Sequence, residues 1–355
     1  MRPVPYCTFY KYLGVNINEF LDFQFTVSMH ADSAGRALSS IITKMIKNGG
    51  FPYKVYSLLY NACVTSVSDY SAAVTGYLQY DSTLQLHLRA IRAFLGVPKN
   101  TCNVGVLSEV GLLLPQYRSN IQMVRHYHRM VNMDDSRLTK QIFLWDRSLN
   151  ESKILSTWSS EVRSIFEKCN MSEIFDLSCS FQLKSLVADM QKHFTFLQND
   201  FLAYECAQKP KLRTFIQFKD FQIEPAYISK PLSFFQRRGV AKIRLGCLPL
   251  RIETARYLVP RIPEGDRKCL VCKNHETHLD VSDPDSVENE IHYLFHCNAY
   301  NEERTIWYNK MTLPLNFCNL ENAQKLKIVL NEPCNVKFTS QFIMNAYNTR
   351  SRILK

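Results

Sequence analysis

Glycine is scarce in this sequence, with 11 residues in a chain of 355. No glycines occur at the spacing of a phosphate-binding loop, so the chain lacks the signature of P-loop nucleotide hydrolases. The Gly-x-Ser-x-Gly turn that carries the nucleophile of α/β-hydrolases is also absent. These absences exclude both motif-defined classes of enzyme.

Long apolar runs are absent as well. The N-terminal residues contain no apolar segment of a signal peptide, and no stretch approaches the roughly 18 apolar residues of a membrane span. We therefore expect a protein of the nucleus or cytoplasm that is not secreted and has no membrane contact. The 12 cysteines should then be mostly reduced, so only a tight cluster of them suggests a metal.

Basic residues outnumber acidic ones by 43 to 32, which gives a net charge of +11. Residues 31–150 carry 13 basic and 7 acidic side chains, and residues 209–273 carry 15 and 5. Residues 274–303 contain 8 acidic side chains and no Lys or Arg. The balance favours a polyanionic partner, and the change of sign near residue 274 predicts a boundary.

Apolar residues recur mostly at helical spacing, so the fold is predicted to be mainly α. The exception is residues 9–17, whose aromatic and β-branched side chains around Gly14 predict a short β-hairpin. One predicted helix stops at Gly49 and Gly50. The predicted apolar stripes are Leu38/Ile41/Ile42/Met45, Val55/Leu58/Leu59/Ala62, Leu84/Leu88/Ile91/Leu95, Ile121/Val124/His128/Val131, Leu138/Ile142/Trp145, Trp158/Val162/Ile165/Cys169 and Phe342/Ile343/Ala346/Tyr347.

Two further helices have distinctive patterns. Between residues 183 and 204, apolar residues alternate steps of four and three over three heptads, which predicts one long helix that ends before Pro210. A basic helix is predicted around residues 231–245. Its apolar side carries Leu232, Phe235, Gly239 and Ile243, and its opposite side carries Arg237, Arg238 and Arg244.

The strongest chemical signal is a pair of cysteines, Cys269 and Cys272, followed after nineteen residues by His292 and Cys297. A Cys-x2-Cys pair can bind one Zn²⁺ from a single turn, and a His and a Cys five positions apart can supply the other two ligands. Four protein ligands leave no open coordination position. The predicted zinc ion is therefore structural rather than hydrolytic.

Other interpretations of these residues stay open. His296 could replace His292 as a ligand, and His275 or His278 could compete for the same position. The Cys-x2-Cys pair could alternatively be a redox pair, although no βαβ pattern surrounds it, or the cysteines could be unligated core residues.

Three passages together resemble non-LTR (LINE-type) retrotransposon reverse transcriptases. YKYLGV (10–15) is similar to the primer-grip hairpin that follows the catalytic palm strands of those enzymes. RALSSIITKMIKNGG, LYNACVTSVSDYSAAV and RAIRAFLGVPKN are similar to successive parts of the helical thumb. LRTFIQFK, AKIRLGCLPLRIETARY, CLVC and ENEIHYLFHCNAY, with Arg304, resemble the carboxy-terminal arm and its Cys-Cys-His-Cys knuckle. The likeness spans nearly the whole chain.

The patterns and the resemblance together divide the chain into five predicted segments. They are a primer-grip-like β-hairpin (1–30), a helical thumb-like domain (31–150), a helical connection with the long amphipathic helix and the basic arm (151–255), the CCHC zinc knuckle (256–310), and a carboxy-terminal tail and helix (311–355).

The resemblance also implies what this stretch of chain does not catalyse. Palm strands of the family carry Asp residues that bind two Mg²⁺ ions for nucleotidyl transfer, and this chain starts after those strands would have ended. We therefore expect Mg²⁺ only in the missing palm, no catalytic residue here and no polymerase activity from this chain alone. Asp134 and Asp135 imitate the catalytic pair, but they lie between two helical stripes and are interpreted as a helix cap. Pro284-Asp285, similar to a nuclease motif of some relatives, lies inside the zinc loop without a downstream carboxylate–Lys pair.

A thumb holds a primer–template duplex through backbone charge and shape. Basic residues on helix faces opposite the apolar stripes, and beside the knuckle, are therefore the predicted contacts for the RNA template and the target DNA. They are Arg89, Arg92, Arg125, Arg129, Arg237, Arg238, Lys242, Arg244, Arg267 and Lys268.

Two functional hypotheses follow. In the first, the chain is the nucleic-acid-binding carboxy-terminal portion of a non-LTR retrotransposon reverse transcriptase, with other proteins of the parent element as further candidate partners. In the second, it is a domesticated, zinc-stapled helical module that binds proteins. The sequence does not fix the oligomeric state.

Overall fold

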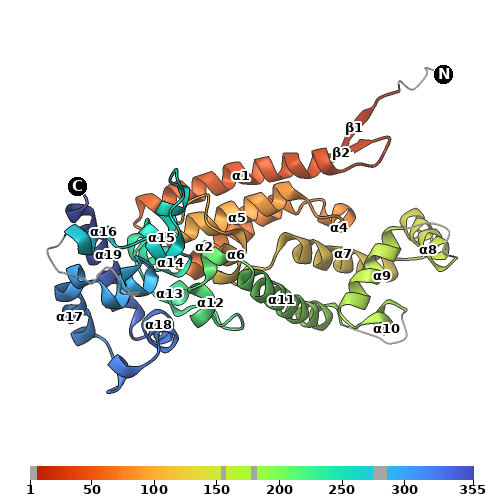
Figure 1. Ribbon diagram of the computed structural model, residues 1–355. Coiled ribbons are helices and arrows are strands. Elements are labelled where there is room, and N and C mark those ends of the chain that lie inside the picture. The colour runs from red at the N-terminus through yellow and green to blue at the C-terminus, as the bar shows by residue number, and fades with distance from the viewer. Residues whose placement is uncertain (1–5, 153–156, 177–181, 275–285) are drawn as a thin grey trace. The chain divides into compact units, whose positions relative to one another are not determined.

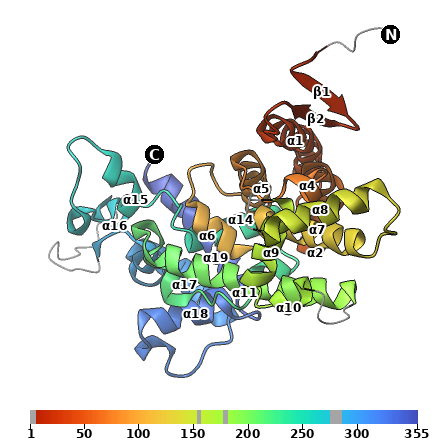
Figure 2. The same ribbon diagram turned by 90° about the vertical axis from the view of Figure 1, so that its right-hand side faces the viewer.

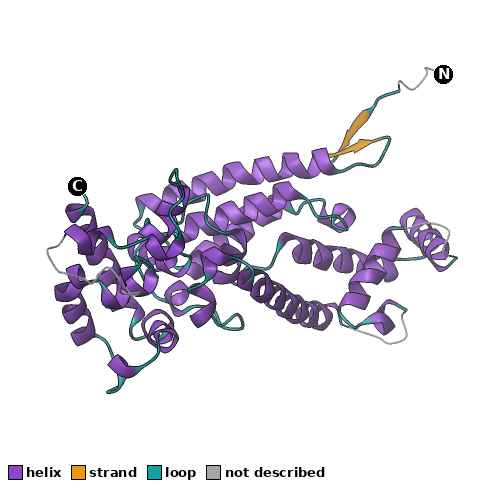
Figure 3. Cartoon of the chain, in the orientation of Figure 1, coloured by secondary structure: helices purple, strands orange, loops and turns teal. Residues whose placement is uncertain are grey.

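The computed structural model describes residues 6–152, 157–176, 182–274 and 286–355. The chain is mainly α-helical, with a two-stranded antiparallel hairpin near its N-terminus and a Cys/His module in its carboxy-terminal part (Figure 3). The predicted fold class is confirmed. Within the described ranges, no helix is both long and apolar enough to cross a membrane.

The chain forms two compact units, each assembled from separate stretches of sequence. Unit 1 comprises Met1–Ile41, Leu58–Leu88 and Leu112–Asn199, and unit 2 comprises Ile42–Ser57, Arg89–Gly111 and Asp200–Lys355. The five segments predicted from the sequence stay a prediction. Unit boundaries fall within four helices, α1 (Gln24–Lys47), α2 (Tyr53–Leu59), α5 (Asp81–Leu95) and α11 (Leu183–Ala207).

The predicted hairpin of unit 1 is confirmed. Strands β1 (Phe9–Tyr12) and β2 (Val15–Asn18) pair antiparallel, with Tyr12 opposite Val15. The two residues between them, Leu13 and Gly14, have φ of 46° and 87°, which are the positive values that a type I′ turn needs at both central positions. The hydroxyl of Tyr70 donates a hydrogen bond to the Leu13 carbonyl at 3.0 Å and fixes the turn.

The rest of unit 1 is helical, and its later helices surround an aromatic core. Tyr127 stacks on Phe175 at 5.0 Å, contacts the rings of Phe143 and Phe166, and donates its hydroxyl to the Phe175 carbonyl at 2.7 Å. In both ribbon views α9 lies between α8 and α10 (Figures 1 and 2). The elements are the π-helix Tyr60–Thr65, α3 (Ser66–Ser68), α4 (Ala72–Thr75), α7 (Pro115–Val131), α8 (Leu138–Glu151), α9 (Trp158–Lys168) and α10 (Ser172–Phe175).

Helix α8 forms where predicted, but its predicted apolar stripe is wrong. Leu138, Ile142 and Trp145 are 70%, 54% and 64% exposed, whereas Phe143 is buried against Tyr127. The stripe was plausible because positions 138, 142 and 145 share one helix face. Which side chain of α8 is buried depends instead on contact with the aromatic core, and Phe143 makes that contact whereas the predicted stripe does not.

The predicted face of α2 is wrong for a different reason. Tyr56, Tyr60 and Val64 are buried, whereas Val55 and Leu58 are exposed. A tyrosine can be buried when its hydroxyl finds a partner. Tyr56 donates to the Ala90 carbonyl at 2.7 Å within unit 2, and Tyr60 lies 2.9 Å from His87 Nδ1 within unit 1.

The long helix predicted from residue 183 is confirmed as α11, and its predicted stripe is buried only in the first half. Val187, Met190 and Phe194 are buried, but Phe201 and Tyr204 are exposed. The heptad spacing continues to the end of the helix, but burial of the stripe does not.

Asp134 and Asp135 lie in an exposed turn between α7 and α8. Asp134 Oδ1 accepts a hydrogen bond from the backbone N–H of Ser136 at 2.9 Å, and hydrogen bonds from Ser136 lower the pKa of this carboxyl group. This turn leads into a helix, and no strand flanks it in the described part of the chain. The geometry is that of a turn ahead of α8 and not of a catalytic strand hairpin, and the cap interpretation stays a prediction.

Unit 2 is organised around the carboxy-terminal helix. Helix α19 packs against α14, α17 and α18 (Figure 1). Phe342, Ile343 and Ala346 of its predicted stripe are buried, and Tyr347 is partly exposed. The helices are α6 (Asn103–Glu109), α12 (Phe215–Phe218), α13 (Ala226–Ser229), α14 (Phe234–Arg244), α15 (Arg251–Thr254), α16 (Leu270–Asn274), the π-helix His292–His296, α17 (Asn301–Lys310), α18 (Asn322–Asn331) and α19 (Val336–Ile353).

Candidate metal centre and basic surfaces

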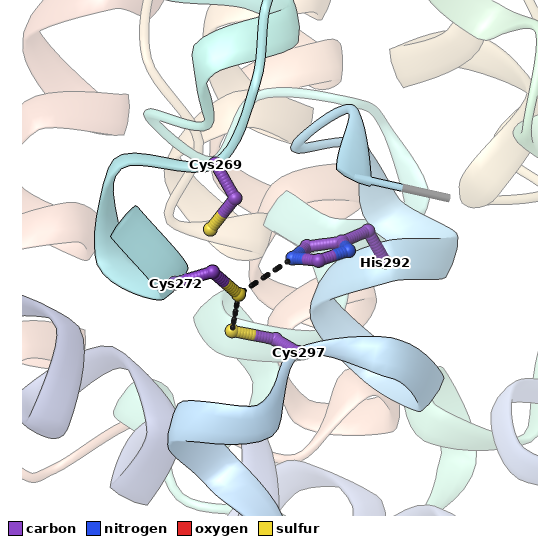
Figure 4. A group of neighbouring side chains, drawn as sticks. All are labelled: Cys269, Cys272, His292 and Cys297. Atoms are coloured by element: carbon purple, nitrogen blue, oxygen red, sulfur yellow. Dashed lines mark hydrogen bonds between the residues drawn. The ribbon is translucent and has the colours of Figure 1, made fainter. Parts of the chain in front are cut away.

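Four side chains converge in unit 2 at the position where the sequence predicts a metal (Figure 4). Cys269 and Cys272 come from the start of α16, His292 begins the π-helix, and Cys297 directly follows it. The three sulfur atoms and one imidazole nitrogen all lie within 4.8 Å of one another, and all four residues are buried. The structure thus brings together every residue of the predicted ligand set.

The distances fit a single tetrahedral ion. Cys272 Sγ lies 3.4 Å from His292 Nε2 and 3.4 Å from Cys297 Sγ. For Zn–S and Zn–N bonds of about 2.3 and 2.0 Å, tetrahedral ligand atoms lie roughly 3.5 to 3.8 Å apart. A disulfide needs about 2.05 Å between its sulfurs, and all three cysteines are free thiols. The cluster can therefore hold a metal ion.

Contacts among the three thiols shift the pKa values of Cys272 and Cys297 in opposite directions. Hydrogen bonds from Cys269 and Cys297 lower the pKa of Cys272 to about 3. The same two-way contacts with Cys269 and Cys272 raise the pKa of Cys297. Ionisation of Cys272 to a thiolate is thus favoured. The negative charge of that thiolate then opposes ionisation of Cys297. A cation at the centre would remove that opposition, because it stabilises several thiolates at once.

Two distant segments are held together beside the cysteines. The backbone N–H of Cys269 donates to the Ser286 carbonyl at 2.9 Å, and Lys268 pairs with Val287 in an antiparallel bridge. The N–H of Glu288 donates to the Arg267 carbonyl at 3.0 Å. These backbone contacts bring the two halves of the ligand set into register without any contribution from the ion.

Arg304 braces the other half of the ligand set. Its Nη2 donates to the carbonyl of Cys297 at 2.8 Å, and its Nε donates to the carbonyl of Leu294 at 3.0 Å. Arg304 is buried, and burial lowers its pKa. The sequence resemblance includes this residue but assigns it no role. The structure shows that it fixes the turn from which Cys297 projects.

Acidic residues between the two halves of the ligand set bind arginines inside unit 2. Glu288 accepts hydrogen bonds from Arg350 of α19 at 2.8 and 3.1 Å and from the backbone N–H of Arg251 at 2.8 Å. Glu290 pairs with Arg213 at 3.2 Å. Both carboxylates are buried. Part of the acidic run that the sequence shows thus neutralises the basic arm, which the charge count alone could not indicate.

Among the alternative ligands, His296 is not a member of the cluster. His275 and His278 lie outside the described residues, as does Pro284-Asp285. The described geometry selects His292 as the nitrogen ligand.

The predicted nucleic-acid contacts fall into three groups by burial. Arg89, Arg125, Arg129 and Arg238 are exposed, and Arg92, Lys242 and Lys268 are partly exposed. Arg92 is also engaged internally, because it donates to the Thr101 carbonyl at 3.0 Å. Whether any of them contacts nucleic acid stays a prediction. The remaining three are Arg237, Arg244 and Arg267, which are buried.

The expectation that Arg244 projects away from the core is wrong. Arg244 donates from Nε and Nη2 to the two carboxylate oxygens of Glu109 at 2.8 and 2.9 Å, and both side chains are fully buried. The hydroxyl of Tyr227 donates to the same carboxylate. Burial would raise the pKa of Glu109, but Arg244, Lys219 and Tyr227 together lower it. The buried carboxylate of Glu109 thus neutralises the charge of Arg244. No sequence pattern predicts Glu109 as the partner.

The expected outward placement is also wrong for Arg237, and Arg267 is not available beside the knuckle. The guanidinium of Arg237 lies 4.0 Å from the Phe94 ring and donates to the carbonyl groups of Phe94 and Phe51 at 2.9 and 3.2 Å. Burial lowers the pKa of Arg237 to about 10. Arg267 donates to the carbonyl of Ile252 at 2.7 Å. In each case buried backbone oxygens accept hydrogen bonds from the guanidinium group, although Nη2 of Arg237 has no hydrogen-bond partner among the described residues.

Comparisons with protein-family models, with characterised proteins and with solved structures find no match for this chain.

Proposed function

We propose that this chain is a nucleic-acid-binding protein whose carboxy-terminal module is held together by a structural zinc ion. The observation that carries the proposal is the buried cluster of Cys269, Cys272, His292 and Cys297. Its four ligand atoms are close enough for one ion, and their burial leaves no open position for a substrate.

The donor set supports zinc over other cations. Thiolate and imidazole ligands in a closed tetrahedral arrangement are typical of Zn²⁺, whereas Ca²⁺ and Mg²⁺ take oxygen ligands. The backbone around the cluster is already ordered by Arg304 and by the bridge between Lys268 and Val287. The ion would thus add stability to a formed site rather than perform chemistry.

The nucleic-acid part of the proposal rests on charge. The chain carries a net charge of +11, and exposed arginines occur on helices of both units, such as Arg129 on α7 and Arg238 on α14. Such residues attract phosphate backbones without reading sequence. The origin in a non-LTR retrotransposon reverse transcriptase rests on the sequence passages alone. An in-frame palm in the upstream genomic sequence would support it.

The test combines metal analysis with a salt titration. Elemental analysis of purified protein should find one zinc per chain. Affinity for a labelled RNA should fall roughly ten- to a hundredfold between about 50 and 200 mM salt, if three or four phosphates are neutralised. Protein without zinc would contradict the structural part, and RNA affinity that does not change with salt would contradict the nucleic-acid part.

One observation favours the second candidate function, a helical protein-interaction module. Leu138, Ile142 and Trp145 are exposed on one face of α8. A contiguous exposed apolar face is typical of a protein contact. Protein that contains zinc but shows no RNA binding at any salt concentration would favour this candidate.

A further inference from the structure

Helices α14 and α19 pack against each other in unit 2, and a groove of about 210 Å³ lies between them. Pockets for drug-sized ligands usually start at about 300 Å³. This groove therefore suits one flat ring rather than a whole small-molecule substrate. Its lining includes Phe235, Arg238, Lys242 and Tyr347.

Two aromatic side chains of the groove are accessible from solvent. Phe235 on α14 is 60% exposed, and Tyr347 on α19 is 37% exposed. Neighbouring Phe342 and Ile343 of α19 are buried, so the exposure of Tyr347 does not reflect a generally open helix. Exposed aromatic rings beside cations are typical of surfaces on which nucleic-acid bases stack.

Two cations of the groove have no acidic partner. Arg238 and Lys242 are one turn apart on α14, and neither side chain makes a hydrogen bond or an ion pair with any residue in the described ranges. Arg237 and Arg244, on the other face of the same helix, are buried, and each donates hydrogen bonds to internal partners. Arg238 and Lys242 thus leave two positive charges at the groove, where an anion would complement them.

The helix that carries these residues is held rigidly. Ser233 and Gln236 form a reciprocal capping box at the start of α14. Gly96, with φ of 69°, lies so close that a Cβ there would be 2.9 Å from Cβ of Arg238. A groove of fixed shape binds a ligand with little loss of conformational entropy.

We infer that this groove binds single-stranded nucleic acid, with one base against Phe235 and Tyr347 and the flanking phosphates on Arg238 and Lys242. This inference rests on the proposed nucleic-acid-binding function and assigns it a place and a strand type. Only an unstacked base can enter a groove of this size, so a duplex should not reach the aromatic rings.

Fluorescence anisotropy with a labelled oligouridine RNA and with a duplex of the same length tests the inference. The double variant Phe235→Ala/Tyr347→Ala should lose roughly ten- to a hundredfold in affinity for the single strand, with its salt dependence unchanged. Arg238→Ala/Lys242→Ala should lower the slope of log affinity against log salt by about 1.4. Tyr204→Ala, which removes an exposed aromatic ring elsewhere in unit 2, is the matched control and should bind like wild type.

The outcomes separate the two proposals. If wild-type protein binds neither RNA, the proposed function and the groove both fail. If it binds with normal salt dependence and Phe235→Ala/Tyr347→Ala behaves like Tyr204→Ala, the groove alone is wrong. Equal losses for single strand and duplex would also overturn it. Phe235→Tyr keeps the ring and should retain affinity. A wild-type free energy of unfolding for Phe235→Ala/Tyr347→Ala excludes misfolding as the cause of its loss.

Discussion

Arg244 and Glu109 lie 135 positions apart in the chain and meet as a two-pronged ion pair with neither side chain exposed to solvent. Arg244 also donates to the carbonyl of Leu330 at 3.1 Å. The pair thus connects α6, α14 and α18 inside unit 2. It is the charged core of the unit that carries the metal centre.

Removal of one partner of this pair should be strongly destabilising. Glu109→Ala leaves the Arg244 guanidinium buried without its counter-charge, which costs about 3–5 kcal/mol. We expect urea unfolding to show that loss in the free energy of unfolding. Replacement of both residues, Glu109→Met with Arg244→Met, should cost less than either single change, because no unpaired charge remains.

The matched control for that experiment is an exposed ion pair. Lys192 and Asp189 lie 3.2 Å apart on α11 with both side chains largely exposed. Asp189→Ala should change stability by less than about 1 kcal/mol. A similar effect for Glu109→Ala and Asp189→Ala would contradict the structural importance of the buried pair.

The same carboxylate predicts a pH dependence of stability. The pKa of Glu109 in the folded protein is below its ordinary value of 4.5, because Arg244, Lys219 and Tyr227 together outweigh the effect of burial. A group with a lowered folded pKa stabilises the protein above its unfolded pKa, and that stability is lost as the pH falls through the folded pKa. The stability difference between wild type and Glu109→Gln should therefore be full near neutral pH and shrink below about pH 4.5.

Urea titrations of both proteins at several pH values measure that difference. Both proteins carry the same Cys/His cluster, so acid effects on the metal ligands cancel in the comparison. A difference that grows as the pH falls would contradict the assigned direction of the pKa shift.

The sequence predicts where helices form better than which face they bury. The apolar residues of α14 suggest a face with Phe235 and Gly239, yet Arg237 and Arg244 lie on the buried side. A rule based on sequence period places arginine on the surface, because it takes no account of a distant residue that could pair with a buried arginine. Glu109 and Phe94, which make burial of these arginines favourable, are far away in sequence.

The metal centre was predictable for the opposite reason. Cys269 and Cys272 are close in sequence, as are His292 and Cys297, so spacing alone constrains their geometry. The residues that orient them were not predictable in this way. Arg304 acts through two backbone carbonyl groups. Because every residue has a backbone carbonyl, such a contact does not restrict which residue type is the partner.

Loss of a metal ligand should remove the ion and destabilise unit 2. Cys272→Ser is expected to reduce bound zinc from one equivalent per chain to a small fraction. Bound metal at a thousandfold excess over its dissociation constant contributes about 4 kcal/mol, so a strong chelator should lower the melting temperature of wild type and leave that of Cys272→Ser unchanged. Cys318→Ser, at an exposed free thiol, is the control and should behave like wild type.

Arg304 should influence metal affinity although it is not a ligand. Arg304→Ala removes the hydrogen bonds to the carbonyl groups of Leu294 and Cys297. Loss of a residue that orients a metal ligand typically weakens metal binding 10- to 100-fold. Competition with a chromophoric chelator measures the change. Lys310→Ala, an exposed cation at the end of the same helix, should leave the affinity unchanged. Equal affinity of wild type and Arg304→Ala would show that the backbone contacts alone hold the site.

Alanine variants of exposed arginines should weaken nucleic-acid binding, whereas alanine variants of buried arginines should lower the stability of the fold. Arg125 and Arg129 are one turn apart on the solvent side of α7, so Arg125→Ala/Arg129→Ala should keep the wild-type free energy of unfolding. If each arginine contacts one phosphate of a single strand, the slope of log affinity against log salt should fall by about 1.4.

Arg237→Ala should lower the stability of the fold and leave the salt slope unchanged. It loses the hydrogen bonds of Arg237 to the carbonyl groups of Phe94 and Phe51, which should reduce the free energy of unfolding by roughly 2–4 kcal/mol. RNA titrations at several salt concentrations, paired with urea unfolding of each variant, measure both effects. An unchanged salt slope in Arg125→Ala/Arg129→Ala would exclude α7 from the nucleic-acid surface and leave α14 as its main candidate.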